Sequence, residues 1–203
     1  MGQIMQVITK TVYSFEELSE EAKEKALQEH ALHNDGFYAE HVIDDAKSIA
    51  ALMGWSLEKV YYSGFWSQGD GACFEGIMRY AKGCAKAVKA YAPKDTELHR
   101  IAQAWQDLQK RNFYAISASV RHSGHYYHSG CTVFDCQDER NNSGYLENFE
   151  IEEEIVRIAR DFMDWIFKQL EIAYDYEVSE ENFRELCKAN GYTFLKCGTM
   201  YNI

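Results

Sequence analysis

The fold is decided around one glycine-rich stretch, Tyr62-Ser63-Gly64-Phe65-Trp66-Ser67-Gln68-Gly69-Asp70-Gly71-Ala72-Cys73-Phe74. Its middle part combines three glycines, two adjacent aromatic residues and a single carboxylate. The residues on either side predict two strands, over about residues 57–65 and 72–78. Asp70-Gly71 is a dipeptide suited to positive φ, so we expect a hairpin turn between the two strands.

A second hairpin is expected further along the chain. Small and β-branched residues alternate over residues 114–120 and again over residues 130–136. Between them lies Arg121-His122-Ser123-Gly124-His125-Tyr126-Tyr127-His128-Ser129-Gly130, which holds three of the seven histidines. The two hairpins predict a mixed, largely antiparallel sheet.

Helical spacing of apolar residues predicts about six helices around these hairpins. Ser14 and Glu17 have the spacing of a capping box at the start of the first helix, and Gly191 is placed to end the last. Further strands are expected near the two ends of the chain, over residues 4–13 and 192–200. The six helices are predicted over about residues 14–33, 37–53, 80–91, 94–111, 149–172 and 179–191. Strands and helices do not alternate regularly, so we expect one α+β domain over residues 1–203.

Composition is ordinary for a soluble globular protein, and we expect a cytoplasmic one. The chain has 203 residues, 46% of them hydrophobic and 26% charged. Its apolar runs are too short for a transmembrane helix, and its first residues lack the features of a signal peptide. The six cysteines show no zinc-ligand spacing. They could pair in a secreted protein, but without an export signal we expect free thiols, no metal and no cofactor.

The net charge of the chain limits the classes of partner that we expect. The formal net charge is −11 and the pI is about 5.1. This argues against a nucleic-acid backbone as the main ligand, because such binding is driven by Lys and Arg. The same charge would help the protein to compete for a basic, nucleic-acid-binding surface of another protein. The simpler explanation of the acidic composition is that it keeps the protein soluble.

Two interpretations of the Trp66 segment remain open. The segment lacks the lysine of a phosphate loop and the repeated oxygen ligands of a calcium loop. It could be a structural hairpin whose Phe65 and Trp66 pack into the core. Alternatively it is a binding loop in which Ser67, Gln68 and Asp70 contact a partner or ligand beside the two aromatic residues.

The histidines suggest two kinds of chemistry, and their spacing supports neither strongly. His122, His125 and His128 would meet one metal ion only if the chain bends sharply at Gly124. Nucleophilic catalysis could combine Ser67 or Cys73 with His125 and Asp70, but no nucleophile motif is present. If the hairpins meet, His125, Tyr127 and His128 would line a pocket with Trp66, Gln68 and Asp70. A histidine beside Asp70 could then act as a general base.

Three segments carry a family resemblance. The run from Tyr62 to Ala72, followed by Phe74, resembles a signature of small proteins encoded by phages and prophages. The run Ser14-Phe15-Glu16-Glu17-Leu18-Ser19-Glu20-Glu21-Ala22-Lys23 and the run from Gly124 to Ser129 are similar to other parts of that family. These proteins often carry the label "antitoxin of toxin–antitoxin stability system". The resemblance covers about two thirds of the chain and implies a phage origin and action in the bacterial cytoplasm.

The expected function is therefore that of a non-enzymatic, phage-encoded protein. It would bind and inhibit a host factor, such as a defence nuclease or a toxin, as an anti-CRISPR-like or antitoxin protein. The alternative is a small-ligand-binding protein or hydrolase with its pocket between the two hairpins. The residues expected to bind are Phe65, Trp66, Ser67, Gln68, Asp70, His125, Tyr127 and His128.

Overall fold

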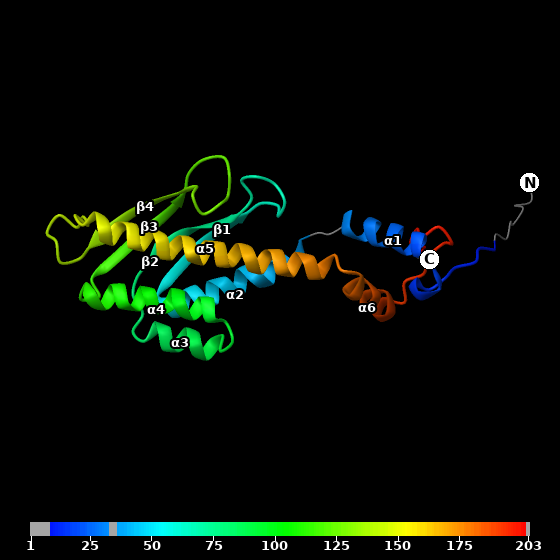
Figure 1. Cartoon of the computed structure of the whole chain (residues 1–203), viewed down its shortest axis with the longest axis horizontal. Coiled ribbons are helices and arrows are strands. Elements are labelled where there is room, and N and C mark those ends of the chain that lie inside the picture. The colour runs from blue at the N-terminus through cyan, green and yellow to red at the C-terminus, as the bar shows by residue number, and fades with distance from the viewer. Residues whose placement is uncertain (1–8, 33–35, 202–203) are drawn as a thin grey trace, which may run out of the picture. The chain divides into compact units, whose positions relative to one another are not determined.

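The α+β class is confirmed by the computed structural model of the chain, which describes residues 9–32 and 36–201 (Figure 1). The described residues form six α-helices, a short 3-10 helix and one four-stranded antiparallel sheet. In chain order the elements are η1 (Phe15–Glu17), α1 (Glu20–Leu32), α2 (Phe37–Met53), β1 (Trp55–Tyr62), β2 (Ala72–Met78), α3 (Cys84–Tyr91), α4 (Thr96–Arg111), β3 (Ile116–His122), β4 (Thr132–Asp138), α5 (Phe149–Glu177) and α6 (Glu180–Asn190).

The sequence predicts one domain over residues 1–203. In the structure the chain divides into two compact units. Unit 1 contains residues 1–38 and 172–203, and unit 2 contains residues 39–171. The whole sheet lies in unit 2, together with α3 and α4. Both segments that the sequence analysis singled out are therefore in unit 2.

The sheet consists of the two predicted hairpins joined edge to edge. Its strand order is β1-β2-β3-β4, with all neighbours antiparallel. The register of β1 shifts between Leu57 and Lys59, which is a bulge opposite Gly76. A Cβ on Gly76 would lie 1.9 Å from the carbonyl oxygen of Ser56. Glycine is therefore required at this position of β2, opposite the bulge in β1.

The core of unit 2 lies between one face of the sheet and the helices α4 and α5. Trp55 of β1 contacts Trp105 of α4 and Phe162 of α5 edge to face, with ring centroids 5.4 and 5.5 Å apart. The indole N–H of Trp105 donates to the carbonyl of Met53 at 3.2 Å. The Trp105 ring is therefore buried with its polar atom paired, whereas the buried Nε1 of Trp55 has no hydrogen-bond partner among the described residues.

Unit 1 has a separate aromatic core. Phe15 packs edge to face on Phe183 of α6, with centroids 5.2 Å apart, and both rings contact Phe194. The capping box predicted at Ser14 is present, with the Ser14 N–H donating to the Glu17 carboxylate at 2.8 Å. It opens η1 rather than the long helix, because Leu18 is extended and α1 begins only at Glu20.

The strands predicted at the chain ends are wrong where the structure describes them. Residues 4–8 of the first lie outside the described residues, and Tyr13 makes a single bridge, to Phe194. In residues 192–200 only Phe194 and Met200 form isolated bridges. The chain bends back there because Gly198 N–H donates to Leu195 O, and Leu195 N–H to Thr199 O, both at 2.9 Å.

Several element boundaries also differ from the prediction. β3 begins at Ile116 instead of residue 114, because Phe113 and Tyr114 both have positive φ. α3 begins at Cys84 instead of residue 80, because Gly83 is left-handed. α5 continues past residue 172 to Glu177. No helix among the described residues is long and apolar enough to span a membrane.

Candidate functional site

The two segments singled out in the sequence are brought together at one end of the sheet (Figure 1). We call residues 63–71, between β1 and β2, the Trp66 loop, and residues 123–131, between β3 and β4, the His125 loop. A Cβ on Gly71 would lie 2.5 Å from Cα of His128, and one on Gly69 would lie 3.0 Å from the Tyr126 ring. The glycines therefore allow the two loops to pack directly on each other.

Asp70 holds the Trp66 loop in shape from within. Its Oδ2 accepts hydrogen bonds from the backbone N–H groups of Trp66 and Ser67, at 3.0 and 2.6 Å. The Asp70 N–H in turn donates to the Ser67 carbonyl at 3.1 Å. The predicted turn is therefore corrected in one respect: positive φ falls at Gly69 (97°), while Gly71 provides the close approach to His128.

The two aromatic residues of the Trp66 loop have different environments. Phe65 is half-buried and stacks on Phe167 of α5, with centroids 5.5 Å apart. Trp66 is 73% exposed, with its ring edge to face against Phe65 at 5.9 Å. The interpretation in which both rings pack into the core is wrong for Trp66. Ser67 and Gln68 follow it on the exposed part of the loop.

In the His125 loop, Tyr127 is a packing residue and His125 is exposed. The Tyr127 ring stacks on Tyr61 of β1 with a centroid distance of 5.5 Å and an interplanar angle of 9°. The His122 ring lies against both tyrosines. Its Nε2 is 3.0 Å from the carbonyl oxygen of Tyr126, which ties the loop to the end of β3.

His128 is committed to contacts within its own loop. Its Nδ1 accepts from the Gly130 N–H at 3.0 Å, so the proton of the neutral imidazole is assigned to Nε2. Nε2 lies 3.4 Å from the thiol sulfur of Cys131. This geometry makes His128 a donor to Cys131 and leaves no described hydrogen bond between His128 and Asp70.

Three residues of this region were not predicted from the sequence. Tyr126 is 54% exposed and covers Gly69. Cys131 was expected only to be a free thiol, and it is half-buried beside His128. Glu75 accepts from the Tyr61 hydroxyl at 3.1 Å and from the His122 N–H at 3.2 Å. Only Cys131 could have been linked to the site from the sequence, because it lies three residues after His128.

The arrangement does not assemble the catalytic set considered from the sequence. The Asp70 carboxylate is used by backbone N–H groups of its own loop. Burial raises the pKa of the Cys73 thiol to about 12, with Cys131 and Glu75 adding to the effect, so Cys73 is protonated at neutral pH. Within residues 9–32 and 36–201, no group of three or more His, Cys, Asp or Glu side chains is placed to hold a metal ion.

Two hollows on the described surface are lined by other residues than the predicted site. One of about 440 Å³ lies on the sheet, between Glu58, Glu75, Ser119, Arg121 and Asp135.

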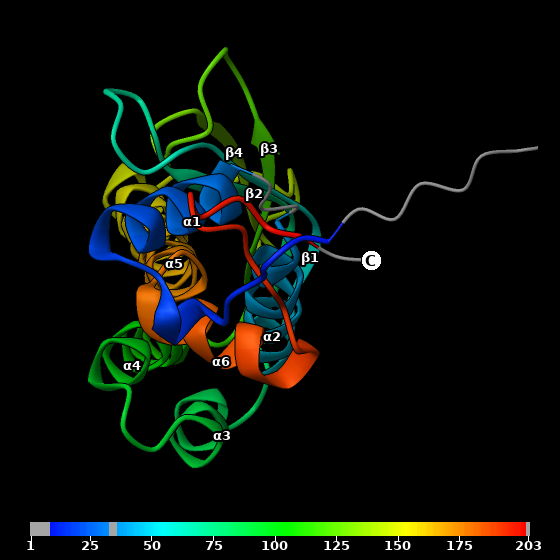
Figure 2. The ribbon, with the colours of Figure 1, turned by 90° about the vertical axis from the view of Figure 1, so that its right-hand side faces the viewer.

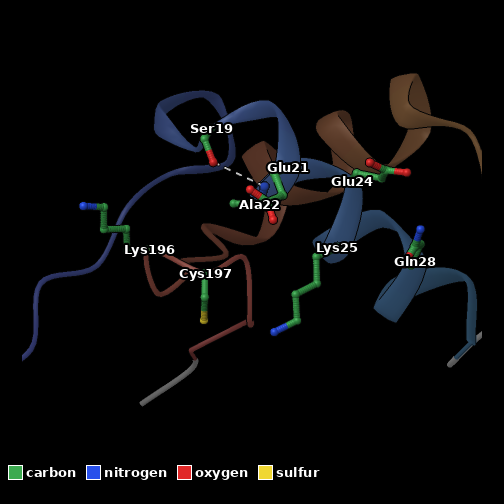
Figure 3. A pocket seen from close by; sticks show the side chains of 8 residues that line it. All are labelled: Ser19, Glu21, Ala22, Glu24, Lys25, Gln28, Lys196 and Cys197. Atoms are coloured by element: carbon green, nitrogen blue, oxygen red, sulfur yellow. Dashed lines mark hydrogen bonds between the residues drawn. The ribbon is translucent and has the colours of Figure 1, made fainter.

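Another hollow, of about 520 Å³, lies in unit 1 between α1 and the segment around Cys197 (Figure 3). Lys25 reaches across it to Thr199, with a hydrogen bond of 3.0 Å. Hydrogen bonds with Thr199, with a smaller contribution from Lys25, lower the pKa of the exposed Cys197 thiol.

A match to a family model places the chain in a family. It belongs to DUF8835, a domain of unknown function, whose model matches residues 38–180. Both loops lie within the matched residues. Comparison with curated proteins and with solved structures found no match.

Proposed function

We propose that this is a non-enzymatic, phage-encoded protein that acts in the bacterial cytoplasm by binding and blocking a host protein. The surface that binds is formed by the Trp66 loop and the His125 loop. The observation that carries the proposal is Trp66, which is 73% exposed at the tip of a loop that is held in one shape. Tyr126 extends this aromatic surface on the neighbouring loop.

Exposed aromatic residues on a preorganised loop are typical of binding hot spots. Trp and Tyr are enriched among the residues that dominate interface energies. Asp70 fixes the backbone, and Phe65 anchors the loop on Phe167. Because the loop is ordered before binding, little conformational entropy is lost when a partner covers Trp66.

The charge of the chain favours a basic partner. At a net charge of −11, a nucleic-acid-binding surface of a defence nuclease or a toxin would attract the protein electrostatically. The resemblance to phage-encoded proteins supports the same class of target. The alternative, a hydrolase or ligand-binding pocket between the hairpins, has less support because Asp70 and His128 are occupied by loop contacts.

A comparative pull-down tests the proposal. The tagged protein, its Trp66→Ala variant and a Phe149→Ala control are used on lysates of bacteria that carry active defence systems. Phe149 is a suitable control because it is also exposed, at 69%, but lies outside both loops. We expect a stoichiometric host protein with the unchanged protein and with Phe149→Ala, and its loss with Trp66→Ala.

Inhibition completes the test. The captured host protein, purified, should lose its activity in proportion to added protein, reaching completion near one equivalent. Failure to recover any stoichiometric host protein would contradict the proposal, as would equal recovery with Trp66→Ala.

A further inference from the structure

A second surface of unit 2 has the opposite charge to the chain as a whole. Residues 76–94 contain no Asp or Glu, although the chain has 32 acidic residues. The same segment contains five basic residues: Arg79, Lys82, Lys86, Lys89 and Lys94. All five are exposed. We call them the α3 basic surface.

The geometry of α3 aligns two of the cations, and a third lies just before the helix. Lys86 and Lys89 are three residues apart and share one face of α3, whereas Lys82 precedes the left-handed Gly83 at the start of the helix. The opposite face buries Cys84 and Val88. Both ribbon views show α3 beside α4 at the margin of unit 2, where its outer side is not covered by another element (Figures 1 and 2).

None of the five cations has an ion-pair partner among the described residues, whereas most other Lys and Arg side chains of the described chain are paired. The nearby carboxylates have other contacts. Asp45 accepts from the Tyr91 hydroxyl at 2.6 Å, and Asp107 accepts from Gln103 at 2.9 Å. The positive charge of this surface is therefore not neutralised from within the unit.

Exposed aromatic rings adjoin the basic surface. Tyr80 stacks on Tyr114 with centroids 4.8 Å apart, and its hydroxyl oxygen accepts from the Gly83 N–H at 3.3 Å, at the start of α3. Phe113, next to Tyr114 in the sequence, is 75% exposed, and the Arg140 guanidinium lies over its ring, 5.3 Å from the centroid. Phe113 and Tyr114 have φ of 57° and 62°, a left-handed conformation that costs an aromatic residue about 1 kcal/mol or more. The backbone is thus strained where it presents these rings.

We infer that the α3 basic surface and the rings of Phe113 and Tyr114 bind single-stranded nucleic acid. The lysines would contact successive phosphates, and the rings would stack on unpaired bases, as is typical of single-strand binding proteins. A duplex does not expose its base faces to such rings. The net charge argued against nucleic acid as the main ligand, but screening over about 8 Å at physiological salt makes the local charge decisive.

This surface is distinct from the one proposed to bind a host protein. Phe113 and Tyr114 precede β3, whereas the His125 loop follows it, so the two surfaces lie at opposite ends of that strand. The inference does not depend on the proposed function. Substitutions at one surface can therefore be tested without changing the other.

Fluorescence anisotropy with labelled dT15 and rU15 tests the inference on the full chain. We expect binding at 50 mM salt that weakens as salt rises, with a slope of log K against log salt of about −0.7 for each phosphate contacted. Lys82→Gln, Lys86→Gln and Lys89→Gln should each weaken binding and make the slope less steep by about 0.7. Phe113→Ala should weaken binding at least about fivefold without changing the slope, because stacking releases no counterions.

Lys196→Gln is the matched control, since Lys196 is an exposed lysine of unit 1 that should leave binding unchanged. Thermal melting of each variant checks that it folds. The inference is overturned if neither oligonucleotide binds at 50 mM salt, or if the three lysine variants bind like the unchanged protein. Equal affinity for heparin, duplex DNA or anionic vesicles, with no effect of Phe113→Ala, would also overturn it in favour of general polyanion attraction.

Discussion

Phe65 and Trp66 are adjacent in the sequence, yet one side chain anchors the loop and the other is presented to solvent. This difference can be measured. Phe65→Ala should lower the free energy of unfolding by about 1–3 kcal/mol, below the value for a fully buried ring, because Phe65 is half-buried against Phe167. Trp66→Ala should change it by about 0.5 kcal/mol or less while abolishing partner binding. Urea titration and pull-down of both variants check this, and the reverse pattern would contradict the roles assigned.

Asp70 is the second test at the residue scale. Replacing a surface turn residue by Ala usually lowers the free energy of unfolding by less than about 1 kcal/mol. Because its carboxylate accepts from two backbone N–H groups, we expect Asp70→Ala to cost about 1–2 kcal/mol and to weaken partner binding by loosening the loop. Gln68→Ala, on the exposed part of the same loop, should weaken binding without changing the melting temperature. If both variants melt and bind like the unchanged protein, the loop is a structural hairpin only.

How much of the site was predictable is clearest for individual residues. Glycines, adjacent aromatics and histidines marked both loops, because few other segments combine conformational freedom with polar side chains. The sequence could not show which ring is buried, since Phe65 finds Phe167 only through the packing of α5. Nor could it show that the carboxylate of Asp70 faces its own backbone.

At the scale of elements, helical and strand periodicity located nearly every helix and both hairpins. The predictions for the chain ends were wrong because apolar alternation over residues 192–200 does not reveal the turn at Gly198. The start of β3 was wrong for a related reason. Phe113 and Tyr114 are ordinary strand residues by type, but they have positive φ where their backbone N–H groups donate to carbonyls at the end of α4 and Tyr114 stacks on Tyr80.

Gly76 is the position where one residue most directly controls an element. A Cβ there would lie 1.9 Å from the Ser56 carbonyl, so Gly76→Ala must displace either the β1 bulge or β2. We expect Gly76→Ala to lower the free energy of unfolding by about 3 kcal/mol or more. Gly144→Ala is the control: its φ is positive, at 74°, unlike that of Gly76, but a Cβ would meet nothing within 4 Å, so the loss of unfolding free energy should be near 1 kcal/mol. Similar losses for the two variants, measured by urea titration, would show that the bulge adapts easily.

At the scale of the whole molecule, the cores of both units contain buried cysteines. Cys73, Cys84 and Cys136 are buried in unit 2 and Cys187 is buried in unit 1, and all are free thiols. Burial is the main cause that raises their pKa values, to about 12 for Cys73 and Cys136 and about 11 for Cys84 and Cys187. An unfolded chain has no such protection, so its thiols ionise near pH 9.

Stability should therefore fall in alkaline solution. Because the folded pKa is raised, the stabilisation by each buried thiol is complete below pH 9 and is lost as the pH rises toward 11–12. The melting temperature should decline between pH 9 and 10.5. Cys84→Ala should melt lower than the unchanged protein at pH 7.5, because it leaves a cavity, yet decline less steeply with pH. Cys84→Ala leaves every other ionisable side chain in place, so the difference in slope isolates Cys84. Parallel curves would mean that Cys84 ionises as readily in the folded protein as in the unfolded chain.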